Sequence, residues 1–225
     1  MSDNKLQIFL IGDSTVQTYG TDDAPQAGWG QYIHRYFTSH AHIQNHAIGG
    51  RSTKTFYEEG RLAPILDGLK QDDYVLIQLG HNDASKNKPE RYTDPFTSYQ
   101  DFLETYIQLI KEHNGRPVLI TPVARLHYEN GHFMNDFEDY CKAMKNVAET
   151  EQVPLIDLMS RSLQHYEAIG YDEAQTLFMV SVKGEDYTHF TEKGADVIAR
   201  LVADEIKHHE QLALSSYVKS GVSLT

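Results

Sequence analysis

Short, continuous apolar runs alternate along the chain with longer stretches in which apolar residues recur every three or four positions. Runs of this kind, bounded by polar or glycine-rich segments, are typical of strands that are buried on both faces of a sheet. They predict strands at residues 6–11, 74–79, 117–121 and 154–158, and a weaker one at 42–47.

The longer stretches predict three amphipathic helices, at residues 96–112, 135–151 and 192–208. Asp94 is placed to cap the first helix, with Pro95 at its first helical position, and Thr191 is placed to cap the last. Cys141, the only cysteine, falls on the apolar stripe of the middle helix. That position predicts a buried structural thiol, and a single cysteine excludes an intramolecular disulfide and a multi-cysteine zinc site.

The alternation of strands and helices predicts an α/β protein, specifically a three-layer α/β/α sandwich around a parallel sheet of about five strands. The chain contains no internal repeat, low-complexity tract or linker long enough to divide it. We therefore expect a single domain over residues 1–225, with its core at about 5–210 and a polar, peripheral tail after His209.

Composition and charge narrow the class of function rather than the fold. The 225 residues are 40% hydrophobic and 23% charged, which are ordinary values for a globular protein. The formal net charge of −12 repels phosphate backbones and anionic lipid, so neither nucleic acid nor a membrane is an expected partner. No apolar run approaches the ~20 residues of a membrane-spanning helix. The first residues lack a signal core, which predicts a cytoplasmic protein.

Polar, glycine-containing segments follow three of the predicted strands, and a fourth precedes the last predicted helix. In an open parallel sheet, ligands bind in the crevice beyond the carboxyl ends of the strands. We therefore expect these segments to converge on one cleft: residues 12–15, 49–52, 80–83 and 186–189.

The residue types in these segments suit acyl transfer. Ser14 is a candidate nucleophile, His189 a candidate base for its proton, and Asp186 a candidate carboxylate for the other ring nitrogen. The Gly50 and Ser14 backbone N–H groups and the Asn82 amide are candidate donors to a developing oxyanion. Each residue alone is more simply a turn, cap or surface residue, and Ser14 lacks the Gly-x-Ser-x-Gly context of α/β-hydrolases. Their joint occurrence in this order favours the catalytic interpretation.

The same segments resemble the sequence blocks of the SGNH (GDSL-type) hydrolases, and they span nearly the whole chain in that family's order. Within the superfamily, the chain is most similar to rhamnogalacturonan acetylesterases and related bacterial carbohydrate esterases. The blocks are Gly12-Asp13-Ser14, Gly50, Gly80-His81-Asn82-Asp83 and Asp186-Tyr187-Thr188-His189, and the narrower similarity rests on Gly28-Trp29-Gly30 and on residues 47–52 and 189–195.

The resemblance implies a flavodoxin-like α/β/α fold and a serine esterase that needs no cofactor. It implies that O-acetyl groups are removed from acetylated pectic oligosaccharides of the rhamnogalacturonan type through an acyl-enzyme. Ser14, Asp186 and His189 match the family's triad positions, and Gly50 and Asn82, with the Ser14 N–H, match its oxyanion positions. An acetylxylan esterase, a broad short-chain esterase and a non-catalytic carbohydrate-binding protein remain as alternatives.

Four further residues are candidates for binding the substrate: Trp29, Arg51, His81 and Arg125. Trp29 is either a wall of the cleft or a core residue. Arg51 and Arg125 are candidates for gripping a uronate carboxylate by paired hydrogen bonds. A surface ion pair is the alternative for both arginines.

Two other chemistries are less well supported. A metal site could use the closely spaced His40, His42 and His46, but no neighbouring carboxylate or cysteine completes a tetrahedral set, so we expect none. A glycosidase needs two carboxylates on either side of a sugar, and the aspartates of the blocks could supply them. That reading leaves the serine and the oxyanion donors without a role.

Overall fold

Five parallel strands form the central sheet of the computed structural model, which describes residues 5–223. The strands stand in the order β3-β1-β4-β5-β8, so the chain starts near the middle of the sheet, moves to one edge and then crosses to the other. This is the strand order of the flavodoxin-like folds. The strands are β1 (Leu6–Gly12), β3 (Ala41–Asn45), β4 (Tyr74–Gln78), β5 (Arg116–Ile120) and β8 (Leu155–Ile156).

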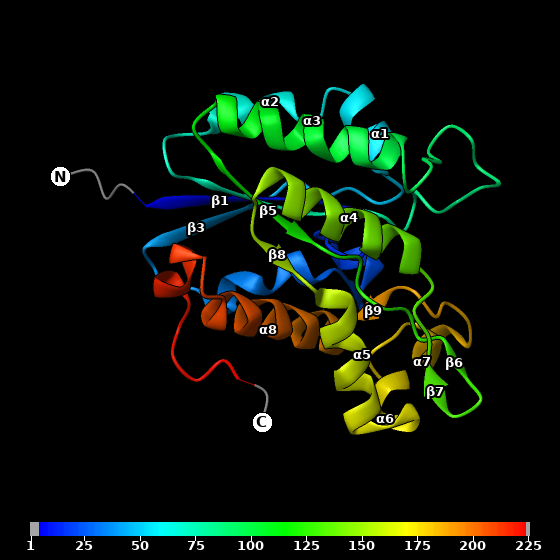
Figure 1. Cartoon of the computed structure of the whole chain (residues 1–225). Helices are drawn as coiled ribbons and strands as arrows, with labels where there is room; N and C mark the ends of the chain where they lie inside the picture. Colours follow the sequence, from blue (N-terminus) through cyan, green and yellow to red (C-terminus); the bar gives the residue numbers. More distant parts are fainter. Residues whose placement is uncertain (1–4, 224–225) are drawn as a thin grey trace.

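Helices cover both faces of the sheet, and the predicted three-layer α/β/α sandwich is confirmed. Figure 1 shows α1, α2 and α3 on one side of the sheet and α8 on the other. The helix α4 packs beside α3, and α5 packs beside α8. The bounds are α1 (Thr53–Glu58), α2 (Ala63–Gly68), α3 (Ser98–Glu112), α4 (Glu138–Glu151), α5 (Leu158–Ile169) and α8 (Glu192–His208).

The five predicted strands all exist, and their continuous apolar runs reflect burial on both faces. Every residue of β4 is buried, as are the last five residues of β1. The run at 154–158 is strand only at Leu155–Ile156. The reason is Asp157, whose side chain accepts a hydrogen bond from the Ser160 N–H and caps α5, so the chain turns helical at Leu158.

The last predicted helix is confirmed, whereas the other two begin later than expected. In α8, the Thr191 side chain accepts a hydrogen bond from the Gly194 N–H, as a capping residue should. Asp94 does not cap α3, because its carboxylate accepts from the Phe96 N–H and closes a turn ahead of the helix. A similar turn at Asn135 delays the start of α4 to Glu138.

Several short elements lack a periodicity that a sequence reading could detect. The antiparallel pair of β2 and β9 is the most consequential, because it joins the segment after Ser14 to the segment that contains His189. The remaining elements are β2 (Gln26–Ala27), β6 (Tyr128–Glu129), β7 (His132–Phe133), β9 (Phe190–Thr191), α6 (Tyr171–Gln175), α7 (Val180–Lys183) and the 3₁₀ helices Thr21–Asp23, Trp29–Gln31, Ile33–Tyr36 and Ala213–Tyr217.

The expectation of a polar, peripheral tail after His209 is wrong. Leu212, Leu214, Val218 and Val222 are at most 4% exposed and belong to the single hydrophobic cluster that fills the protein. Val218 also forms an isolated β-bridge with Phe37. These apolar residues are sparse and irregularly spaced in a polar background, so only their packing against α8 shows that they are core residues.

The middle of the chain contributes a buried thiol, as predicted. Cys141 is 4% exposed on α4, and burial raises the pKa of its thiol to about 12. The thiol is therefore an inert core group rather than a nucleophile.

Across residues 5–223, no helix has the length and apolar character that crossing a membrane demands.

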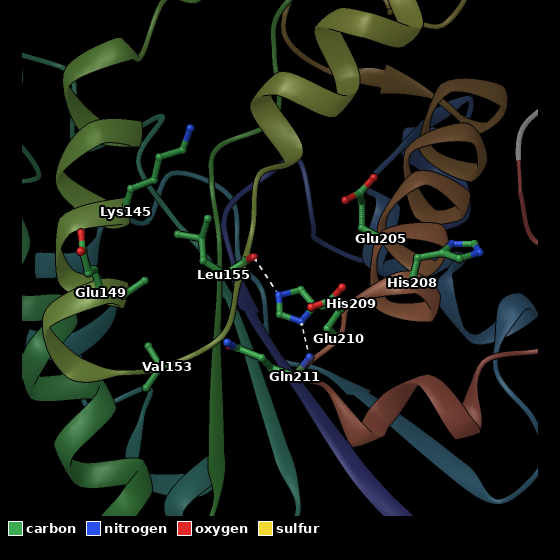
Figure 2. Close-up of a pocket in the computed structure, with 10 residues that line it drawn as sticks. Lys145, Glu149, Val153, Leu155, Glu205, His208, His209, Glu210 and Gln211 are labelled. Atoms are coloured by element: carbon green, nitrogen blue, oxygen red, sulfur yellow. Dashed lines mark hydrogen bonds between the residues drawn. The ribbon is translucent and has the colours of Figure 1, made fainter.

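At the open edge of the sheet, a histidine from the segment after α8 forms a hydrogen bond with the backbone of β8. The His209 Nε2 donates a hydrogen bond to the Leu155 carbonyl oxygen at 3.2 Å, and its Nδ1 accepts one from the Gln211 N–H (Figure 2). A cavity of about 550 Å³ adjoins this contact, between the ends of α4 and α8. His209 thus satisfies one carbonyl of an edge strand that is only two residues long, and such short edge strands offer little backbone for pairing with another chain.

Candidate active site

The four polar segments meet beyond the carboxyl ends of the strands, as the sequence predicts. Gly12 pairs with Gln78 across β1 and β4, so the loops that follow these strands leave the sheet next to each other. Beyond β3, the Ile48 N–H donates to the Gly12 carbonyl oxygen, which brings the glycine pair after it against Ser14. The pairing of β2 with β9 then places His189 over the same loop.

Ser14, His189 and Asp186 form a continuous chain of hydrogen bonds. The His189 Nε2 lies 2.9 Å from the Ser14 Oγ, and its Nδ1 lies 2.9 Å and 3.0 Å from the two carboxylate oxygens of Asp186. An ionised carboxylate only accepts hydrogen bonds, so Nδ1 carries the hydrogen. The Nε2 lone pair is then free to accept the proton of the Ser14 hydroxyl.

The carboxylate of Asp186 is held ionised and in place by its own loop. Burial alone would raise its pKa, but the His189 backbone N–H, the His189 ring and the Thr188 backbone N–H stabilise the charge, and together they lower the pKa. The residue has a φ of +79°, a left-handed conformation that a non-glycine residue adopts at some cost in strain. Strain of this kind is concentrated at functional sites, where neighbouring contacts maintain it.

The nucleophile loop is fixed by the side chain before Ser14. The Asp13 Oδ1 accepts hydrogen bonds from both the N–H and the hydroxyl of Thr15, each at 2.8 Å. The Gly28-Trp29-Gly30 segment packs directly on this loop, because a Cβ at either glycine would collide with the backbone of Val16 or Gln17. These glycines therefore permit close packing behind the nucleophile and contribute no binding surface.

Trp29 and His81 are buried beneath Ser14, so their prediction as substrate-binding residues is wrong. Trp29 is 1% exposed, and its Nε1 donates to the Gln78 Oε1 at 2.7 Å. His81 is 5% exposed; its Nδ1 pairs with the Asp13 carboxylate at 3.0 Å, and its Nε2 donates to the Val123 carbonyl oxygen. Adjacency in sequence to a site residue does not show to which side of the loop a side chain points.

Replacing Trp29 by phenylalanine should destabilise the protein without weakening substrate binding. The change leaves the buried Gln78 Oε1 without its donor, and such a loss lowers the free energy of unfolding by about 1–3 kcal/mol. Urea unfolding followed by far-ultraviolet circular dichroism would measure this, and steady-state kinetics would show an unchanged KM. A raised KM at unchanged stability would instead place the indole in the substrate site.

The candidate oxyanion donors belong to loops that meet near Ser14, since a Cβ on Gly49, the neighbour of Gly50, would lie 3.4 Å from the Ser14 Cβ. Gly50 has a φ of +81°, which glycine adopts without the penalty of a side chain. The Asn82 Nδ2 donates one hydrogen bond to the Arg51 carbonyl oxygen at 2.9 Å, which leaves its second hydrogen available. Among the backbone hydrogen bonds of residues 5–223, neither the Ser14 N–H nor the Gly50 N–H has an acceptor. Unused donors beside a nucleophile are what an oxyanion hole requires.

The other acidic residues of the blocks have structural roles. Asp83 is fully buried, which raises its pKa to about 6, and it accepts hydrogen bonds from the N–H and hydroxyl of Thr53 and from the Thr93 hydroxyl. Asp13 is fully buried as well. With Asp13 and Asp83 turned away from the surface, no pair of block carboxylates faces a sugar, which removes the basis for a glycosidase.

The two arginines singled out in the sequence have different surroundings. Arg51 forms an ion pair with Glu59 at 3.1 Å and donates to the Gly49 carbonyl oxygen, so it supports the loop that carries Gly50. Arg125 forms no ion pair among the described residues and lies over the Phe137 ring at 5.0 Å. A third arginine, Arg91, lies beside Gly50 and was not singled out, because no motif marks its position in a long loop.

One of the three histidines considered as metal ligands is hydrogen-bonded to another side chain. The His42 Nδ1 is hydrogen-bonded to the Gln7 side chain at 2.8 Å. Within the described part of the chain, no group of three or more histidine, cysteine, aspartate or glutamate side chains is arranged to hold a metal ion. The site is therefore interpreted from its serine, histidine, aspartate and amide groups alone.

The chain is similar to known proteins over most of its length. Residues 8–202 match the GDSL-like Lipase/Acylhydrolase family. The chain belongs to this family of hydrolases, and it is a carboxylic ester hydrolase.

Its relatives include two Bacillus subtilis (strain 168) proteins. The chain is 56% identical over 200 residues to "Probable rhamnogalacturonan acetylesterase YesY", covering 89% of this chain and 92% of that protein. It is 41% identical over 217 residues to "Rhamnogalacturonan acetylesterase RhgT", covering 92% of each. The crystal structure of the Bacillus subtilis protein YxiM superposes with a TM-score of 0.82 at 30% identity, over 92% of this chain and 57% of that one.

Proposed function

We propose that this esterase removes O-acetyl groups from acetylated pectic oligosaccharides of the rhamnogalacturonan type, with Ser14 as its nucleophile. The hydrogen-bonded chain from Ser14 through His189 to Asp186 is the observation that carries the proposal. The substrate class is supported by the two relatives at 56% and 41% identity, a probable rhamnogalacturonan acetylesterase and a rhamnogalacturonan acetylesterase.

In the first half of the reaction, Ser14 is acetylated. The His189 Nε2 accepts the hydroxyl proton while the Ser14 Oγ forms a bond to the acetyl carbonyl carbon. Negative charge develops on the carbonyl oxygen, and the N–H groups of Ser14 and Gly50 and the Asn82 amide stabilise it. Asp186 stabilises the imidazolium that forms at the same time. The bond to the sugar oxygen then breaks, and that oxygen takes the proton from His189.

In the second half, water releases the acetyl group. The His189 Nε2 accepts a proton from a water molecule, and the hydroxyl that remains attacks the carbonyl carbon of acetyl-Ser14. The same donors stabilise the second oxyanion. When the bond to the Ser14 Oγ breaks, that oxygen regains the proton from His189, and acetic acid leaves as acetate. The enzyme thereby returns to its starting state.

Acetate release across a panel of acetyl esters tests the proposal. The panel contains acetylated rhamnogalacturonan oligosaccharides, acetylated xylo-oligosaccharides, acetylated monosaccharides and a lipid ester, with p-nitrophenyl acetate as a general control. We expect the highest kcat/KM on the rhamnogalacturonan fragments. An equal or higher value on the xylo-oligosaccharides would favour the acetylxylan alternative. Sugar binding without hydrolysis of any ester would favour a non-catalytic carbohydrate-binding protein.

The oxyanion assignment predicts a specific kinetic defect for Asn82→Ala. Loss of one oxyanion donor lowers kcat by about 10²–10³-fold, with a smaller effect on KM, because the interaction is strongest in the transition state. Asn82→Asp keeps the shape of the side chain but presents an acceptor, so it should be at least as inactive. Kinetics on p-nitrophenyl acetate would measure both variants, and a near-normal kcat in both would exclude Asn82 as a donor.

A further inference from the structure

Two arginines beside the proposed active site carry buried nitrogen atoms that bond to nothing in the protein. Among residues 5–223, Arg91 Nε and Arg125 Nε are the buried side-chain nitrogen and oxygen atoms without a hydrogen-bond partner. Buried polar groups nearly always have a partner, so these two Nε atoms mark guanidinium groups whose hydrogen-bonding capacity the protein does not fully use. Arg91 lies beside Gly50, and Arg125 lines a cavity with residues of the segment that contains Asp186 and His189.

Arg125 lies near the segment that contains Asp186 and His189. It lines a cavity of about 440 Å³ together with Tyr187 and Thr188, which stand between the two triad residues in the sequence. Tyr128 and Tyr171 line the same cavity, and aromatic faces of this kind pack well on sugar rings.

The charge of Arg125 is not matched by a partner in the protein. Burial lowers the pKa of its guanidinium. The carboxylates of Asp136, Asp13 and Asp186 act in the opposite direction and raise this pKa, but the effect of burial is larger. Asp136, the other charged group that lines the cavity, is hydrogen-bonded to the His127 Nδ1 at 2.5 Å and forms no ion pair with Arg125. The guanidinium is thus half-buried, charged and available to an anion.

Arg91 lies next to Gly50, one of the proposed oxyanion donors. Its Nη1 is 3.7 Å from the point that a Cβ on Gly50 would occupy. Its Nη2 donates to the Ser85 hydroxyl at 3.2 Å, and none of the ion pairs within residues 5–223 includes it. Arg91 is half-buried as well, so it presents a second charged group at the rim of the site.

We propose that Arg91 and Arg125 bind uronate carboxylates of the substrate. This inference rests on the proposed function, because rhamnogalacturonan oligosaccharides carry a carboxylate on every galacturonate residue. A guanidinium recognises a carboxylate through two parallel hydrogen bonds, and partial burial strengthens that contact. The two local positive charges also offset a protein net charge of −12, which otherwise repels an acidic oligosaccharide.

The test pairs two forms of one substrate with three variants. An acetylated rhamnogalacturonan oligosaccharide is used as the free acid and as its methyl ester, which removes the negative charges, and acetate release is measured at constant pH and ionic strength. The variants are Arg91→Gln, Arg125→Gln and the matched control Arg116→Gln. Arg116 begins β5 at the other end of the sheet and pairs there with Asp72.

We expect the wild-type protein to have a kcat/KM about tenfold higher on the free acid than on the methyl ester, mainly through KM. Arg91→Gln and Arg125→Gln should each lose about tenfold on the free acid and almost nothing on the methyl ester or on p-nitrophenyl acetate. Arg116→Gln should match the wild type on every substrate. Equal losses on charged and neutral substrates would overturn the inference, because they would indicate a structural role.

Comparing the free acid with the methyl ester on the wild-type protein tests carboxylate recognition even if a variant does not fold. Equal rates on the free acid and the methyl ester would overturn carboxylate recognition while leaving the proposed function intact. No acetate release from either form, with release from p-nitrophenyl acetate preserved, would instead overturn the proposed substrate and this inference with it.

Discussion

Replacing Ser14 by alanine should reduce ester hydrolysis by several orders of magnitude on every substrate that the protein accepts. The Ser14 Oγ is the atom to which the acetyl group is transferred, and no other hydroxyl is hydrogen-bonded to the His189 Nε2 among the described residues. Stability should change little, because the half-buried hydroxyl makes a single hydrogen bond, with a net contribution of about 0.5–1.5 kcal/mol. Steady-state kinetics and urea unfolding would measure the two effects separately.

Ser216→Ala is a suitable control for this variant. Ser216 lies in the 3₁₀ helix after α8, and its hydroxyl donates only to the Ala213 carbonyl oxygen. It should retain full activity. Residual activity of Ser14→Ala within about tenfold of the wild type, a difference of only ~1.4 kcal/mol in transition-state stabilisation, would contradict the assignment.

Replacing Asp186 by asparagine should lower kcat by about 10³–10⁴-fold with the fold intact. The asparagine amide can donate to the His189 Nδ1, which stabilises the tautomer that carries its hydrogen on Nε2 and cannot accept the Ser14 proton. The variant also removes the negative charge that stabilises the imidazolium. The acid limb of the pH–rate profile should therefore move to lower pH, which kcat measured across a pH series would show.

The pH dependence of this variant follows from the lowered pKa of Asp186 in the folded protein. Because its pKa is below the ordinary value of 3.8, the carboxylate stays ionised throughout the acid limb of the wild-type profile. Protonation of Asp186 therefore does not set the acid limb of the wild-type profile. An acid limb that stays in place, with kcat barely reduced, would contradict the role of Asp186. Asp13 and Asp83 could not replace it, because both are buried and bonded elsewhere.

The parts of the fold that could be predicted from sequence are those with a strong period or a continuous apolar run. The sheet and α8 were found in this way, and the candidate site residues were selected because each follows a strand or precedes a helix. The short helices α6 and α7, between Tyr171 and Lys183, were missed, since elements of a few residues have no measurable period. Their positions depend on tertiary packing, as does the burial of Leu212 and Val218 after α8.

Within the site, sequence identified residue types but not the direction of each side chain. The Ser14 hydroxyl bonds to His189, whereas the neighbouring Asp13 and the more distant His81 are buried in the core and bond to each other. A loop has no fixed alternation that would have shown this difference. Arg91 could not be found at all, because its relevance comes from its distance to Gly50 across a separate loop.

The central claim is that Ser14 forms the acyl-enzyme, and labelling with a serine-directed organophosphonate tests it most directly. Intact mass measurement followed by peptide mapping would locate the adduct, while acetate release from rhamnogalacturonan oligosaccharides is recorded in parallel. We predict one adduct per chain, on Ser14, with activity falling in proportion to labelling and with slower labelling of Asp186→Asn. Full labelling with activity retained, or loss of activity with the adduct on another residue, would contradict the account.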